Sequence, residues 1–170
     1  MVKNLSLILT TLIIGGFIYL AVKGNDVQEI QTEIEISAPP AKVWGILSDI
    51  GKWQDWSPII NKSSGSLAVG ETLAITMVGK EAGKDGPHYA PKIIELNQQK
   101  SFRWRAHMMA GFIFTNDKVF ELHETSTGTR VVHKELFSGL LAPIFCGQME
   151  KGVPPMLEAM NQALKQLAES

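Results

Sequence analysis

The sequence predicts an α+β domain in which one long C-terminal helix covers the inner face of an antiparallel sheet. The last thirty residues, 141–170, place large apolar residues three and four positions apart, the spacing of a helix with one apolar face. Residues 59–139 form a succession of alternating segments separated by turn residues, a pattern typical of antiparallel strands. A helix that is apolar on one face only must pack on another element, and the strands supply that surface.

The C-terminal helix is predicted from its apolar stripe. Its members are Met149, Val153, Met156, Met160, Leu164 and Leu167. Pro154 and Pro155 lack the backbone N–H that a helix interior uses, and a proline disfavours helical angles in the residue before it. We therefore expect the main helix to start at Pro155, after a looser, partly helical run over 144–151.

The preceding elements follow from alternation and turn residues. Residues 30–36 alternate apolar and polar side chains, as a half-buried strand does. Pro40 suits the first turn of a short helix, and residues 52–58 form a turn or a second short helix. About six strands follow, with a loop over 79–87 that contains three glycines.

Length and composition exclude several classes of protein. The 170 residues are enough for one domain with its own core. A net charge of −1 gives no electrostatic reason to bind nucleic acid. The single cysteine, Cys146, excludes an internal disulfide and any metal cluster that needs several cysteines.

The N-terminal segment is apolar. Residues 5–22 carry no charge and lie between Lys3 and Lys23. The length of this uncharged stretch is about the minimum for a helix that crosses a bilayer. A cleaved signal peptide is the alternative, but the apolar run exceeds the usual ~7–15 residues of such signals. We predict a transmembrane anchor over 1–23, a linker over 24–28 and a domain over 29–170. The single-pass protein would place that domain on the extracytoplasmic side.

Four passages resemble the START-like, or SRPBCC, superfamily in the expected order. They are residues 35–44 (EISAPPAKVW), 48–58 (SDIGKWQDWSP), 128–139 (GTRVVHKELFSG) and 156–169, which contains AMNQALK. The superfamily includes lipid-transfer domains, birch-pollen-allergen-like proteins and polyketide cyclases. The resemblance implies a helix-grip fold, in which a curved antiparallel sheet of six to seven strands wraps around the last helix. Between the sheet and the helix lies a cavity for a hydrophobic ligand. It implies no particular chemistry, because the superfamily holds binders, transporters and some enzymes.

The last two strands can be paired from the turn between them. If Thr125 faces Gly128, then Phe120 lies opposite His133, Lys118 opposite Glu135 and Asn116 opposite Phe137. The apolar residues of these pairs share one face, which must be the inner one. A slip of one residue would turn the whole set outward.

The inner face then carries a polar end formed by Lys118, Glu135 and His133. One interpretation is that these side chains orient a carboxylate, hydroxyl or carbonyl of a ligand. The other is a cross-strand ion pair at the open rim, worth ~0.2–1 kcal/mol, that binds nothing. His133 and Glu135 are the candidate catalytic residues, with His133 as a general base if a partner orients it.

The walls of the predicted pocket come from the inner faces of strands and helix. Its predicted ligand-binding residues, besides Lys118, Glu135 and His133, are Asn116, Phe120, Phe137, Leu73, Ile75, Met77, Trp104, Met108, Met156 and Met160. Methionine and aromatic side chains suit an adaptable apolar ligand, although a solid core would show the same pattern.

Sequence motifs for metals and cofactors are lacking. There is no HExxH, no nucleophile elbow, no phosphate-binding glycine loop and no dinucleotide fingerprint. His107 and His123 fall on outward faces of their strands, as surface residues do. We therefore expect neither a bound metal nor a cofactor.

Three functions remain open. The first is a membrane-anchored, non-catalytic binding domain for a hydrophobic small molecule or lipid, tethered through residues 5–22. The second is a cyclase, dehydratase or hydrolase that uses His133 and Glu135. The third is an accessory protein whose segment 53–58 or 79–87 meets an unidentified protein partner.

Overall fold

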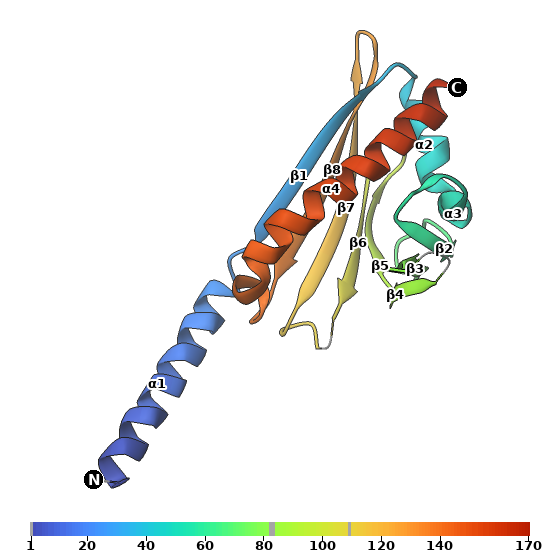
Figure 1. The fold of residues 1–170 in the computed structure, drawn as a ribbon. Coiled ribbons are helices and arrows are strands. Elements are labelled where there is room, and N and C mark those ends of the chain that lie inside the picture. The colour runs from blue at the N-terminus through green and yellow to red at the C-terminus, as the bar shows by residue number, and fades with distance from the viewer. Residues whose placement is uncertain (1, 82–83, 109) are drawn as a thin grey trace.

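A computed structural model describes residues 2–81, 84–108 and 110–170, with side chains from residue 10 onward. Figure 1 shows a long helix lying across a curved sheet, with a second helix, α1, extending away from one end. The elements in order are α1 (Val2–Lys23), β1 (Gln28–Ile36), α2 (Pro40–Ser48), η1 (Ile50–Lys52), α3 (Trp53–Trp56), β2 (Ile60–Ser64), β3 (Ala74–Val78), β4 (Asp85–Tyr89), β5 (Lys92–Asn97), β6 (Ser101–His107), β7 (Thr115–Thr125), β8 (Gly128–Ser138) and α4 (Ala142–Glu169).

The main sheet has five antiparallel strands in the order β1-β8-β7-β6-β5. The predicted register of the last hairpin is confirmed, since Thr125 pairs with Gly128, Phe120 with His133 and Lys118 with Glu135. Gly128 has φ of +152°, and a Cβ there would collide with the carbonyl oxygen of Ile36. Glycine at this turn therefore lets β8 start close against the end of β1.

A second sheet of three strands, β2-β3-β4, corrects the prediction of six to seven strands in one sheet. Among the described residues the chain forms eight strands in two sheets. Strand β4 (sequence DGPHY) begins inside the predicted loop over 79–87, of which residues 82–83 fall outside the described part, and extends to Tyr89. Its proline is tolerated because β4 is an edge strand. Because its sequence holds a glycine and a proline and does not alternate, the pattern did not indicate a strand there.

Helix α4 is continuous from Ala142 to Glu169, so the predicted start at Pro155 is wrong. Pro154 and Pro155 lie inside the helix, where each removes one backbone hydrogen bond. The helix nevertheless buries Leu157, Met160 and Leu164 against the rest of the domain. This tertiary packing, rather than intrinsic propensity, stabilises the turn around the prolines.

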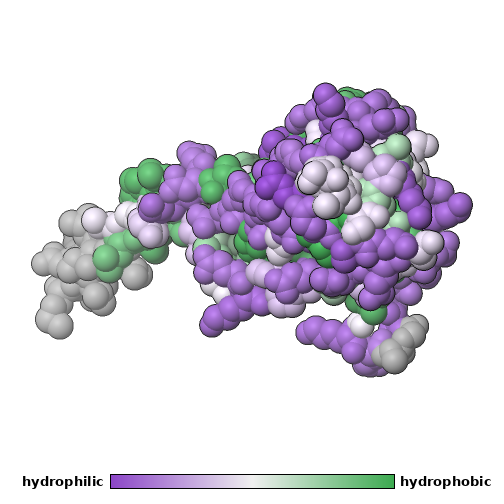
Figure 2. Space-filling model, turned by 90° about the horizontal axis from the view of Figure 1, so that it is seen from above, coloured by the Kyte–Doolittle hydropathy of each residue, from purple (hydrophilic) through white to green (hydrophobic). Residues whose placement is uncertain are grey.

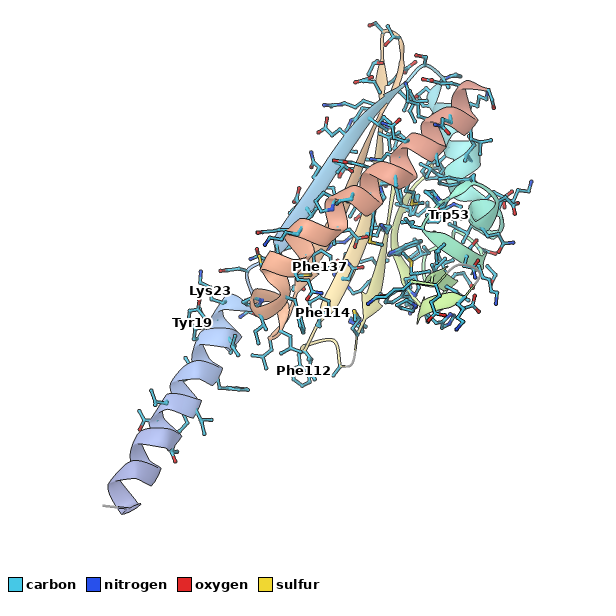
Figure 3. The ribbon with its side chains drawn as sticks, viewed as in Figure 1. Tyr19, Lys23, Trp53, Phe112, Phe114 and Phe137 are labelled. Atoms are coloured by element: carbon cyan, nitrogen blue, oxygen red, sulfur yellow. The ribbon has the colours of Figure 1, made fainter. Side chains whose placement is uncertain are left out.

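The interior holds two clusters of buried apolar side chains. The larger, which we call the aromatic cluster, contains Trp44, Trp53, Phe102 and Phe120 among its members. The smaller, the Phe114–Phe137 cluster, also contains Leu157. Figure 3 labels members of both, with Trp53 at α3 and with Phe114 and Phe137 near the first turns of α4.

Trp53 occupies the centre of the aromatic cluster. Its side chain is fully buried and its ring centroid lies 5.3 Å from that of Trp104. The indole N–H donates to the carbonyl of Leu47 at 3.0 Å, so burial leaves no polar atom of this ring unsatisfied. Within the segment 53–58, Trp53 is therefore not available to a protein partner.

The predicted transmembrane helix is corrected. Over the part of the chain whose residues are described, no helix is long and apolar enough to cross a membrane. The first residues of the predicted span, 5–9, lie outside the described side chains. The predicted membrane anchor, single-pass localisation and extracytoplasmic placement therefore lose their basis.

Helix α1 meets the domain at Gly24. The N–H of Gly139 donates to the carbonyl of Gly24 at 2.8 Å, and a Cβ on Gly24 would collide with the Gly139 backbone. Figure 2 shows hydrophobic residues on the coloured part of the projecting helix, whereas the domain surface seen from above is mostly hydrophilic.

Candidate functional site

A cavity of about 220 Å³ lies between α4, the inner face of the main sheet and the small sheet. It separates the two apolar clusters, since Trp104 and Met160 of the aromatic cluster and Phe137 of the smaller one all line it. The lining residues are Ile59, Ile60, Ile75, Met77, Tyr89, Pro91, Trp104, Ala106, Met108, Asn116, Lys118, Glu135, Phe137, Val153, Met156 and Met160.

Most of the side chains predicted to bind a ligand are at this cavity. Those that line it are Asn116, Lys118, Glu135, Phe137, Ile75, Met77, Trp104, Met108, Met156 and Met160. Leu73, Phe120 and His133 are not among the lining residues, because they are buried in the core behind the wall. Whether the lining residues bind a ligand stays a prediction.

The predicted pocket residues Ile75 and Met77 come from β3 of the small sheet, but the contributions of β2 and β4 were not predicted. Ile60 and Tyr89 line the cavity from β2 and β4, and Pro91 follows β4 directly. Both strands are short and rich in polar or turn residues, so alternation gave no signal for them. Tyr89 was expected to begin a strand over 89–96, whereas it ends β4 and the next strand, β5, begins at Lys92.

The polar end of the cavity is built on the β7–β8 pairing. Lys118 Nζ lies 2.5 Å from Glu135 Oε1, and Asn116 Nδ2 donates to Glu135 Oε2. The side chains of Lys118 and Glu135 are only 10% and 12% exposed. The pair is therefore nearly buried rather than at an open rim, and removing one partner would leave an uncompensated charge.

Behind this pair, a chain of hydrogen bonds reaches helix α4 and strand β1. Lys118 Nζ lies 2.9 Å from His133 Nε2, and His133 Nδ1 lies 3.0 Å from Asn161 Oδ1. Asn161 Nδ2 in turn donates to Thr32 Oγ1 at 2.9 Å. An ammonium can only donate, so Nε2 accepts and the proton of His133 sits on Nδ1, from which it is donated to Asn161.

His133 is neutral in this arrangement. Its burial and the nearby Lys118 ammonium lower its pKa well below the ordinary value, and the hydrogen bond with Asn161 opposes them only in part. The ring also stacks on Phe120, with centroids 4.0 Å apart. With Nε2 occupied by Lys118 and no face on the cavity, His133 is not placed to act as a general base on a ligand.

Tyr89 adds a phenol to the cavity wall. Burial, together with the charge of Glu135, raises the pKa of its hydroxyl. The group therefore stays protonated at neutral pH and can donate a hydrogen bond. Among the described residues no group of three metal-ligating side chains is close enough to hold a metal ion.

These features define a helix-grip domain with a mostly apolar cavity and one polar end. A family model for "Polyketide cyclase / dehydrase and lipid transport" matches residues 27–169, and the chain belongs to this family. The resemblance to the START-like superfamily is thereby confirmed. No curated protein matches the sequence.

Solved structures show the same fold. Protein CV1439 from Chromobacterium violaceum superposes with a TM-score of 0.67 at 16% identity, over 84% of this chain and 98% of that one. A point mutant of norcoclaurine synthase from Thalictrum flavum superposes with a TM-score of 0.64 at 19% identity, over 84% of this chain and 94% of that one. The di-domain ARO/CYC StfQ from the steffimycin biosynthetic pathway superposes with a TM-score of 0.69 at 10% identity, over 84% of this chain and 51% of that one. At these identities the likeness concerns the fold alone.

Proposed function

We propose that this protein binds a small hydrophobic molecule in the cavity between α4 and the sheets, with the polar group of the ligand at Lys118 and Glu135. The observation that carries the proposal is the cavity itself, about 220 Å³ in volume and lined mainly by apolar side chains around a few convergent polar groups. A polar end of this kind fixes the orientation of a bound molecule, while the apolar walls supply most of the affinity.

The size of the cavity limits the ligand. Drug-sized ligands occupy about 300–1,000 Å³, whereas an apolar cavity of about 150 Å³ suffices for benzene. A volume of about 220 Å³ therefore favours a molecule with one ring and a short substituent over a long-chain lipid. The adaptable methionines Met77, Met156 and Met160 on the walls allow some variation in shape.

Calorimetric titration with a one-ring ligand such as acetophenone tests the proposal. A ligand of this size should bind with a dissociation constant on the order of 0.1–1 mM. The matched control is Ala106→Leu, which places a larger side chain on the cavity wall and should abolish binding while the domain stays folded. Equal heats of binding for the two proteins, or no binding to the wild type, would remove the proposal.

Catalysis is a second candidate function, because three titratable side chains, Tyr89, Lys118 and Glu135, line one cavity. A cyclase or dehydratase could use Glu135 to move a proton on a bound substrate. A turnover screen comparing the wild type with Glu135→Gln tests it. Loss of turnover in Glu135→Gln would support catalysis, and unchanged turnover would exclude Glu135 from the mechanism.

A further inference from the structure

The hydrogen-bonding capacity of the polar end is asymmetric. The Lys118 ammonium has three N–H donors, of which one is directed to Glu135 and one to His133. Within the described residues no further acceptor is bonded to it, so one donor is available to the cavity that Lys118 lines. The Tyr89 hydroxyl, on the same cavity, is a second donor.

Both carboxylate oxygens of Glu135 already have one partner. Lys118 engages Oε1 and the Asn116 amide donates to Oε2, which leaves each oxygen one further lone pair. The amide oxygen of Asn116 remains as a neutral acceptor. A hydrogen bond from an ammonium is roughly twice as strong as a neutral one, so the unused N–H of Lys118 outweighs the neutral groups of Tyr89 and Asn116.

The charge of the polar end is already balanced, because Lys118 and Glu135 neutralise one another. A ligand carboxylate or amine would bring an additional charge into a nearly buried place without an unpaired opposite charge to meet it, which is costly. A neutral oxygen acceptor, by contrast, takes the free N–H of Lys118 and disturbs no existing pair.

Resting on the function proposed above, we propose that the cavity selects a small neutral carbonyl compound, a ketone or aldehyde, and that Asn161 is the positioning residue that sets this selectivity. Asn161 Oδ1 holds the His133 proton on Nδ1, which leaves Nε2 as an acceptor for Lys118. This contact fixes the direction of the ammonium and with it the donor offered to the ligand. Asn161 itself is buried in α4 and does not line the cavity.

Four ligands of nearly identical planar shape test the selectivity. Acetophenone carries the carbonyl, α-methylstyrene replaces it by an apolar methylene, benzoate is an anion and benzamidine is a cation. Acetophenone should bind about tenfold more tightly than each of the other three. If α-methylstyrene binds as tightly as acetophenone, the cavity binds ligands but the selectivity claim fails. Tightest binding of benzoate or benzamidine overturns it as well, and binding of none overturns the proposed function too.

Asn161→Asp tests the positioning role. A carboxylate beside Nδ1 favours the imidazolium form of His133, whose Nε2 then carries a proton toward the Lys118 ammonium and repels it. The preference for acetophenone over α-methylstyrene should fall from about tenfold to about onefold. Gln162→Glu adds the same charge on the exposed face of α4 and should keep the preference.

The imidazole ¹⁵N chemical shifts of His133 in the wild type give a result that does not depend on any variant folding. We expect a neutral ring with the proton on Nδ1. A proton on Nε2, or a positively charged ring at neutral pH, would overturn the proposal. In Asn161→Asp the same spectrum should show the imidazolium, and a neutral ring there together with an unchanged ligand preference would count against Asn161.

Discussion

The two ends of strands β6 and β7 differ in how their inner faces are filled. At one end, Phe102 of β6 and Phe120 of β7 stack with ring centroids 5.1 Å apart, and Trp53 closes over them. At the other end, Ala106 and Asn116 stand at the corresponding inner positions and the cavity begins. One sheet thus carries a solid core and a hollow, and the difference lies in side-chain size rather than backbone.

Lys118, His133 and Glu135 lie at the border between the two ends. His133 is fully buried and stacked on Phe120 of the aromatic cluster, whereas Glu135 lines the cavity. Lys118 contacts both. These polar residues are thus anchored in the solid end and reach the cavity at the hollow end.

The largest expected effect comes from Trp53→Ala, at the solid end. Removing a fully buried indole should lower the free energy of unfolding by about 3–5 kcal/mol. The control at the hollow end is Met156→Ala. Because Met156 is 40% exposed, this change should lower the free energy of unfolding by less than about 1 kcal/mol. Urea denaturation measures both, and equal losses would mean that the two ends are packed alike.

Breaking the pair at the border should cost about 3 kcal/mol or more. Lys118→Met leaves the Glu135 carboxylate nearly buried and without its cation. The double variant Lys118→Met/Glu135→Leu removes both charges and should recover most of this loss. A double-mutant cycle by urea denaturation checks the coupling, and strictly additive losses would show that the ion pair contributes nothing.

Enlarging one side chain at each end sharpens the comparison further. Val131→Leu forces extra volume into the aromatic cluster and should cost about 1–3 kcal/mol. Ala106→Leu extends into the cavity and should cost less than about 1 kcal/mol. Thermal unfolding of both variants measures the difference. A larger loss of stability in Ala106→Leu than in Val131→Leu would mean that the cavity does not lie beside Ala106.

The buried His133 predicts a pH dependence of stability. Its pKa is lowered in the folded protein, so the unfolded chain takes up a proton near pH 6.5 while the native state does not. This contribution is complete above pH 6.5 and is lost as the pH falls toward the folded pKa. Between pH 7.5 and 5.5 the wild type should lose about 1.4 kcal/mol more than His133→Gln in urea denaturation. Identical pH dependence of the two proteins would mean that His133 is not buried in the neutral form.

Much of the main sheet could be predicted because a short turn fixes its register. The two residues between Thr125 and Gly128 set the parity of every pair down the hairpin, so Lys118 had to face Glu135. The depth of a residue along that face could not be predicted in the same way. Phe120 and His133 share the inner face with Lys118, yet tertiary packing buries them behind the cavity wall.

Other features depend on contacts that no local pattern encodes. The spacing of the last helix predicts Asn161 on its outer, polar side. In the structure α4 lies on the sheet so that the Asn161 side chain contacts His133 and Thr32. The strands that bring Ile60 and Tyr89 to the cavity are short edge strands without alternation. The continuity of α4 through Pro154 likewise reflects packing, which outweighs local propensity.

The central claim, that the cavity beside Lys118 and Glu135 takes up an apolar ligand, is tested most directly by methyl NMR of methionine-labelled protein. Met77, Met108, Met156 and Met160 line the cavity, whereas Met149 packs on the Phe114–Phe137 cluster and serves as an internal control. Saturating acetophenone should shift the four cavity methyl signals and leave that of Met149 in place. Unmoved cavity signals, or shifts confined to Met149, would contradict the account.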